Sequence, residues 1–213
     1  MRIQRSADKS TFKVTQSGLA QQLIDKHVMA DSKTSSSPYT PDLFNQSSTN
    51  EPVDESILDN FLSIIMCLMY IARLTRTDLL LSSTYLASKS HSPTSTDMRK
   101  LGRVLRYLKG TIDQGVTIHC TELRVYAFCD ASYAIHSDGR SHTGFLFSLG
   151  RCFSYLHARC SKQKLSATSS TDAEIFAVVD CLKVLVWICN LLQELAICKK
   201  QTSILYQDNQ SAI

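Results

Sequence analysis

The residue pattern changes period near Leu123, and this change constrains the fold more than any other feature of the sequence. In the stretch LRVYAFCD, Leu123, Val125, Ala127 and Cys129 fall on one face, and Tyr126, Phe128 and Asp130 fall on the other. Such alternation predicts a half-buried strand over Leu123–Asp130. The runs Thr143–Leu149 and Arg151–Ala158 follow with only Gly150 between them, which predicts a tight hairpin. A helix over Asp172–Ile197 and a last strand over Ser203–Asp208 complete the pattern. Strands, a helix and a strand parallel to the first predict an α/β fold with a mixed sheet.

The segment before this change is mostly helical, and its last helix carries a stripe of cations. In TDMRKLGRVLRYLKGT, residues Met98, Leu101, Val104, Leu105 and Leu108 recur at helical spacing on one face. The opposite side carries the cations Arg99, Arg103 and Arg106, with Lys100 and Lys109 beside them. Two interpretations stay open at this point, a solvated helix face and a surface that contacts phosphates. Further upstream, a short helix behind Ser17 precedes a Ser-, Thr- and Pro-rich loop or linker over 32–52.

Composition narrows the cellular setting. The chain has 213 residues, a net charge of +4 and eight cysteines, without a Cys-x-x-Cys pair or a signal peptide at its start. Reduced thiols in an intracellular compartment, cytoplasmic or nuclear, are therefore expected. The longest apolar run, Phe61–Ala72, has 12 residues. Because a membrane span needs about 20, this run predicts a core helix and no membrane partner.

Carboxylates stand at the ends of two predicted strands, Asp130 in YAFCD and Asp208 in ILYQD. Parallel neighbours would place both at the edge of the sheet where α/β folds bind ligands. Glu174 lies at the top of the helix stripe that must face the sheet. Each residue also has a purely structural explanation: Glu174 in a capping box with Thr171, Asp130 in a turn, and Asp208 as a helix cap. Converging carboxylates, by contrast, favour a hard cation such as Mg²⁺ or Mn²⁺.

Several motifs together resemble one family. CDASYAIHSDGRSHTGFLFSLG, SKQKLSATSSTDAE and LYQDNQSAI are similar, in order and spacing, to the ribonuclease H domain of copia-type LTR retrotransposon Pol polyproteins. LRYLKGT and its surroundings resemble the connection segment that precedes that domain, and VTQSGLAQQLIDKHVM resembles the end of the reverse transcriptase. The resemblance implies a reverse transcriptase remnant and linker over 1–52, a helical connection over 53–118 and a C-terminally truncated ribonuclease H-like domain over 119–213.

The resemblance also implies roles for single residues. Asp130, Glu174 and Asp208 match the metal carboxylates with which the family cleaves RNA in RNA–DNA hybrids. The cationic helix face then becomes a candidate contact for the hybrid backbone. The sequence departs from the family in three respects. It has no Tyr-x-Asp-Asp polymerase motif and no fourth metal aspartate, and YLHARCSKQ lacks the tryptophan that commonly precedes the family's Ser-Lys-Lys-Gln stretch.

Two functional hypotheses follow from these observations. The first is a ribonuclease H-type module that uses Mg²⁺ or Mn²⁺. The second is a non-catalytic, truncated relic that at most binds nucleic acid or a partner. Since two ions need enough negative charge to offset their mutual repulsion, three carboxylates predict that the chain binds the hybrid weakly and cleaves it poorly or not at all. The chain is expected to be a monomer or part of a larger polyprotein, and whether it is an enzyme stays open.

Overall fold

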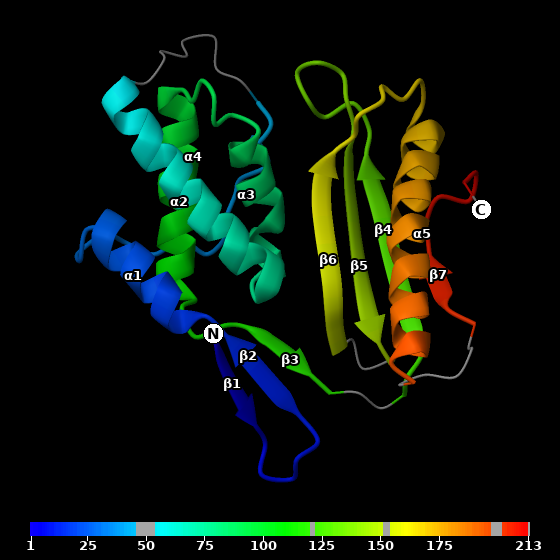
Figure 1. The fold of residues 1–213 in the computed structure, drawn as a ribbon. Helices are drawn as coiled ribbons and strands as arrows, with labels where there is room; N and C mark the ends of the chain where they lie inside the picture. The colour runs from blue at the N-terminus through cyan, green and yellow to red at the C-terminus, as the bar shows by residue number, and fades with distance from the viewer. Residues whose placement is uncertain (46–53, 120–121, 151–153, 197–201, 213) are drawn as a thin grey trace. The chain divides into compact units, whose positions relative to one another are not determined.

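The computed structural model describes residues 1–45, 54–119, 122–150, 154–196 and 202–212 (Figure 1). The chain forms two compact units. The first comprises residues 1–3 and 14–116, and the second comprises residues 4–13 and 117–213. A three-stranded sheet has the order β1-β2-β3, with β1 at Arg2–Arg5, β2 at Phe12–Thr15 and β3 at Val116–Ile118. The three-part division expected from the family resemblance stays a prediction.

The first unit is helical. It contains α1 (Ser17–His27), α2 (Glu55–Leu74), the short 3-10 helix η1 (Thr77–Leu79), α3 (Leu80–Ala87) and α4 (Ser95–Gly110). The expected cap Ser17 is the first helical residue of α1, and the N-cap is Gln16. At α4 the side chain of Thr94 accepts from the backbone of Asp97 and the Asp97 carboxylate accepts from the backbone of Thr94, a capping box that fixes the start of the helix.

The buried face of α4 matches the apolar stripe in its sequence. Leu101, Val104, Leu105 and Leu108 are all buried, as the helical spacing predicts. They belong to a core that also contains fully buried side chains of α2 and α3. The polar side of the helix is therefore set by the packing of its apolar side.

The second unit contains a four-stranded sheet in the order β6-β5-β4-β7. Its strands are β4 (Val125–Ser132), β5 (His142–Leu149), β6 (Ser154–Lys162) and β7 (Ile204–Tyr206). β4 pairs with β5 and β5 with β6 in antiparallel fashion, whereas β7 runs parallel to β4. The expected mixed sheet and the parallel pairing of the first and last strands are confirmed. The predicted turn after Gly150 involves residues 151–153, which lie outside the described residues.

Helix α5 (Ser170–Glu194) packs along one face of this sheet (Figure 1). Its residues Cys181, Leu185, Ile188 and Leu192 form one buried cluster with Val125, Ala127 and Cys129 of β4 and Phe145 and Phe147 of β5. The same alternation that identifies β4 in the sequence places its apolar side against α5, because successive side chains of a strand point to opposite faces. Among the described residues, Cys67, Cys129, Cys160, Cys181 and Cys189 are free cysteines.

Two helices, α2 over Ile57–Leu74 and α5, are long and apolar enough to cross a membrane by length and composition alone. Both are longer than the uninterrupted apolar run of 12 residues in the sequence, because the mean hydropathy of a helix stays high when a few polar residues lie between apolar ones. Part of each is buried in a core: Phe61, Ile65 and Leu68 of α2 and Cys181 of α5 have no exposed surface. Core packing therefore accounts for only part of their apolar character, because apolar side chains such as Met66 of α2 and Val186 and Trp187 of α5 are exposed.

Candidate metal centre

Three carboxylates from separate elements converge at one end of the four-stranded sheet. Asp130 lies on β4, Glu174 near the beginning of α5, and Asp208 just after β7. One side-chain oxygen of each lies within 4.8 Å of the others, and no other such group of potential ligands occurs among the described residues. Glu174 is buried, whereas Asp130 and Asp208 are exposed. The cluster is thus buried on the side of Glu174 and open to solvent on the side of the two aspartates.

The strand register explains why the two aspartates meet. The parallel ladder between β4 and β7 pairs Phe128 with Tyr206, so Asp130 and Asp208 both follow the last registered pair by the same number of residues. Across the antiparallel ladder, Asp130 faces Gly144, which has no side chain to cover the carboxylate. Parallel strands that end at the same level bring their following residues to the same edge of the sheet. The shared position after each β-rich run is therefore the signal that predicts this convergence.

The capping alternative for Glu174 is wrong. The N-cap of α5 is Ser169, whose hydroxyl accepts a 3.1 Å hydrogen bond from the backbone N–H of Asp172. Thr171 lies inside the helix, so it forms no capping box with Glu174. Glu174 instead continues the stripe that faces the sheet, and its side chain is directed toward the other two carboxylates. Helix capping therefore does not explain why the Glu174 carboxylate is buried.

Electrostatics at Glu174 favour a bound cation. Burial raises the pKa of its carboxyl group, hydrogen bonds from Gln207 and the Ala131 backbone oppose that rise, and the charges of Asp130 and Asp208 add to it. A divalent ion would remove the repulsion among the three groups. Carboxylate oxygens without histidine or thiolate suit Mg²⁺ or Mn²⁺. The donor set and the spacing therefore fit a divalent hard cation.

Gln207 joins the Glu174 carboxylate to the backbone of Asp208 and was missed by sequence reasoning. Its Nε2 donates to Oε2 of Glu174 at 2.9 Å, and its Oε1 accepts from the backbone N–H groups of Asp208 and Asn209 at 2.7 and 3.2 Å. Only its position beside Asp208 could have drawn attention to it. A single glutamine carries no spacing pattern that predicts such a link.

The cations proposed for nucleic-acid contact differ in their surroundings. Lys109 donates to the backbone carbonyls of Met29, Ala30 and Ser32 at 3.3, 2.6 and 3.1 Å. Arg99 is exposed and donates to the hydroxyl of Thr96 at 3.0 Å.

The other two arginines of this set, Arg103 and Arg106, are half-buried. Nε of Arg103 is buried without a hydrogen-bond partner among the residues described. A Cβ added at Gly102 would lie 3.7 Å from Nη1 of Arg106, so that guanidinium lies along its own helix. Nucleic-acid binding by all four stays a prediction.

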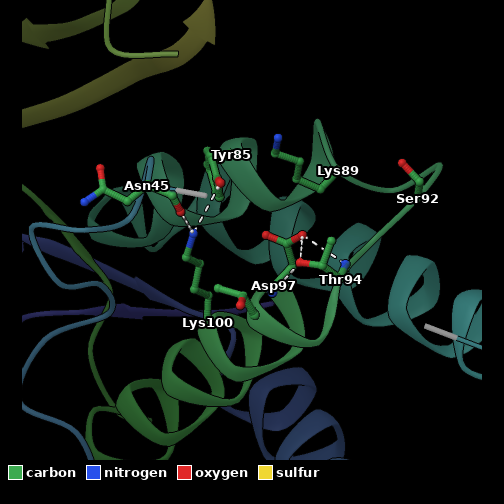
Figure 2. A pocket seen from close by; sticks show the side chains of 8 residues that line it. Asn45, Tyr85, Lys89, Ser92, Thr94, Asp97 and Lys100 are labelled. Carbon is green, nitrogen blue, oxygen red and sulfur yellow. Dashed lines mark hydrogen bonds between the residues drawn. The ribbon is translucent and has the colours of Figure 1, made fainter. Parts of the chain in front are cut away.

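A hollow of about 250 Å³ lies in the helical unit (Figure 2). It is lined by Asn45, Tyr85, Lys89, Ser92, Thr94, Thr96, Asp97 and Lys100. Lys100 points across it and donates to the carbonyls of Leu43 and Asn45 at 2.7 and 2.9 Å, and its ammonium lies 4.8 Å from the centre of the Tyr85 ring. Asp97 is occupied by the capping box of α4. The charges of Lys100 and Asp97 thus serve the local structure.

A second group of ionisable side chains lies away from the carboxylates. His136 Nε2 and His142 Nδ1 are 2.9 Å apart, and His142 Nε2 lies 2.9 Å from the Cys160 sulfur. His136 and His142 are buried. Burial, together with the nearby His136 and Lys162, lowers the pKa of His142 to about 4. His142 is therefore neutral at pH 7.

Relatives of the chain place these features in a family. An uncharacterized mitochondrial protein of Arabidopsis thaliana is 35% identical over 187 residues, which cover 87% of this chain and 75% of that protein. The retrovirus-related Pol polyprotein from transposon RE2 of Arabidopsis thaliana is 36% identical over 151 residues, 70% of this chain and 10% of the polyprotein. The corresponding polyprotein from transposon TNT 1-94 of Nicotiana tabacum is 31% identical over 153 residues, 71% of this chain and 11% of the polyprotein.

No protein-family model and no solved structure matches the chain. The chain thus spans about a tenth of the length of the transposon polyproteins, whereas it covers three quarters of the mitochondrial protein. The order of motifs, the mixed sheet and these relatives all agree. The chain belongs to the family of copia-type retrotransposon Pol polyproteins.

Proposed function

We propose that the second unit is a ribonuclease H-type module that hydrolyses the RNA strand of an RNA–DNA hybrid with Mg²⁺ or Mn²⁺. The observation that carries this proposal is the convergence of Asp130, Glu174 and Asp208, whose oxygens lie within 4.8 Å of one another. The relatives named Pol polyproteins support an origin in a retrotransposon. Replication of such an element through an RNA template would supply RNA–DNA hybrids as substrates.

The buried carboxylate and the two exposed carboxylates have different parts in the proposal. Glu174 would hold the ion from below, because it is buried and anchored by α5 and Gln207. Asp130 and Asp208 are exposed and would hold the ion on the side open to a phosphodiester. When bound, divalent ions of this kind supply an activated water and stabilise the leaving oxygen in phosphodiester cleavage. The residues themselves would fix the position of the scissile phosphate relative to that chemistry.

Hybrid binding would depend in part on the cations of α4. Arg99 is exposed, and contacts from such a residue to phosphates position a duplex without selecting its sequence. Lys109 is less suited to this role, because its ammonium already donates to three backbone carbonyls. Affinity for the hybrid should fall steeply with salt, since each phosphate contact releases counterions.

A hybrid-cleavage assay in Mg²⁺ and in Mn²⁺ tests the proposal. We expect the wild-type chain to cleave only the RNA strand of the hybrid and to leave duplex DNA intact. Asp130→Asn should abolish cleavage. Asp180→Asn is the matched control, because Asp180 is an exposed residue of α5 that pairs only with Lys183, at 3.1 Å, among the described residues. Its substitution should leave cleavage unchanged.

The assay also separates the two hypotheses that the sequence leaves open. Hybrid binding that is independent of divalent ions, with no turnover in either ion, would refute the nuclease and leave a nucleic-acid-binding protein. Cleavage that persists in Asp130→Asn would show that the activity comes from another site or a contaminant. Slow turnover that Asp130→Asn removes would support the nuclease.

A further inference from the structure

Gln207 lies between Glu174 and the backbone of Asp208, and both polar atoms of its side-chain amide form hydrogen bonds. Its amide nitrogen donates to Glu174 Oε2 at 2.9 Å. Its amide oxygen accepts from the N–H groups of Asp208 and Asn209 at 2.7 and 3.2 Å. A carboxylate on α5 is thereby connected to the backbone that carries the carboxylate after β7.

In the part of the chain that the structure describes, the backbone around Asp208 lies beyond the strand pairing of β7. The ladder between β4 and β7 ends with the pair Phe128 and Tyr206, so no strand pairing reaches Asp208. Among the described residues, the side chain of Asn209 makes a local contact, in which its Oδ1 accepts from the Ser211 N–H at 2.9 Å. The position of the Asp208 carboxylate relative to Glu174 therefore depends on the bridge through Gln207.

We propose that Gln207 is a positioning residue of the metal centre, which sets the affinity for a divalent ion by holding Asp208 in register with Glu174 although it is not itself a ligand. This inference rests on the proposed metal-binding function. Glutamine suits the position because its amide combines one donor for a carboxylate with one acceptor for two N–H groups. Asparagine is one methylene shorter and does not span the same two partners. Leucine or methionine offers neither a strong donor nor a strong acceptor.

A neutral amide at position 207 suits a site that binds a cation. A cationic side chain at position 207 would satisfy Glu174 but would repel the ion, and an acidic one would add repulsion among the carboxylates. The neutral amide leaves the negative charge of the three carboxylates available to the ion. Outer-shell partners of this kind typically change metal affinity by about 10- to 100-fold when they are removed.

The test measures Mn²⁺ binding by electron paramagnetic resonance on the full chain, without any substrate. Gln207→Met should weaken Mn²⁺ binding by about 10- to 100-fold. Its melting temperature in EDTA should stay close to that of the wild type, because the bridge stabilises the geometry of the site rather than the core. If Gln207→Met does not fold, Gln207→Asn takes its place, with the same loss of affinity expected.

A double-mutant comparison separates positioning from a general structural effect. In an Asp208→Asn background, Gln207→Met should cause little further loss of Mn²⁺ affinity, since the carboxylate that Gln207 positions is already gone. An equal loss in both backgrounds would overturn the proposed role. Wild-type affinity in Gln207→Met would also overturn it, while leaving the metal centre intact. By contrast, a wild-type chain that binds no Mn²⁺ would refute the metal centre itself and, with it, the proposed nuclease.

Discussion

The stability of the second unit should depend on pH through His142. This residue begins β5 and is 4% exposed. The ionisable groups around it are His136 from the loop before β5, and Cys160 and Lys162 of β6. None of these three groups is a carboxylate, and the carboxylate of Asp138 pairs with Lys162 at 2.6 Å. Protonation of His142 in the folded chain is therefore unfavourable.

The magnitude follows from the difference between the folded and unfolded pKa values. Burial, His136 and Lys162 lower the pKa of His142 from 6.5 to about 4. At about 1.4 kcal/mol for each unit, the full difference corresponds to roughly 3 kcal/mol. Because the unfolded chain binds the proton more readily, this contribution is fully present above pH 6.5 and is lost as the pH falls toward 4.

Urea unfolding at a series of pH values between 7.5 and 4.5 measures this effect. The free energy of unfolding should fall toward low pH more steeply in the wild type than in His142→Gln, which keeps a polar side chain but does not titrate. His91→Gln, at an exposed position, should retain the wild-type slope. Glu174 acts in the opposite direction, since its raised pKa favours the folded state at low pH. The difference between wild type and His142→Gln is therefore the relevant quantity, and parallel curves would refute the argument.

Four further substitutions test the core, a helix cap and the cations of α4. Phe147→Ala should lower the free energy of unfolding by about 3–5 kcal/mol in a urea titration, because Phe147 has no exposed surface in the cluster beneath α5; a loss below about 1 kcal/mol would contradict that packing. Thr94→Ala removes the cap of α4 and should cost about 1 kcal/mol in the same titration. Lys109→Met should lower the melting temperature while Arg99→Met does not, because Lys109 donates to backbone carbonyls and Arg99 is exposed; the reverse order would refute a structural role for Lys109.

The sheet and its helix could be predicted because their residues follow a regular period. Alternation along Leu123–Asp130 places Val125, Ala127 and Cys129 on one face of β4, and all three are buried. It fails at Leu123, which is exposed, and at Tyr126, which is buried although it lies on the other face. Boundaries were less accurate: the last strand covers only Ile204–Tyr206 rather than Ser203–Asp208. The spacing of apolar residues reflects which face of an element is buried, whereas the ends of a strand are set by individual backbone hydrogen bonds. The sequence therefore predicts the layers of this fold better than their limits.

The surroundings of the carboxylates could be predicted only in part. Asp130 and Asp208 follow strands, and that shared position indicates a common edge of the sheet. Gln207 and the contact between His142 and Cys160 have no comparable signal, because each joins segments that are distant in sequence through one pair of atoms. Such contacts depend on rotamers and on local twist, which residue patterns do not determine. A site can thus be located from the sequence while the residues that hold it in place are missed.

The cations of α4 show why charge alone is a weak predictor of nucleic-acid binding. An ammonium group satisfies a phosphate oxygen and a backbone carbonyl with the same N–H donors. Lys109 donates to the backbone carbonyl of Ala30, just before the Ser- and Pro-rich segment, and Lys100 donates to that of Leu43 within it. A carbonyl is present at every residue, so the sequence cannot mark which ones will need a donor. Arg99 has no such backbone contact among the described residues, and any binding of the hybrid by α4 therefore depends on its arginines more than on these two lysines.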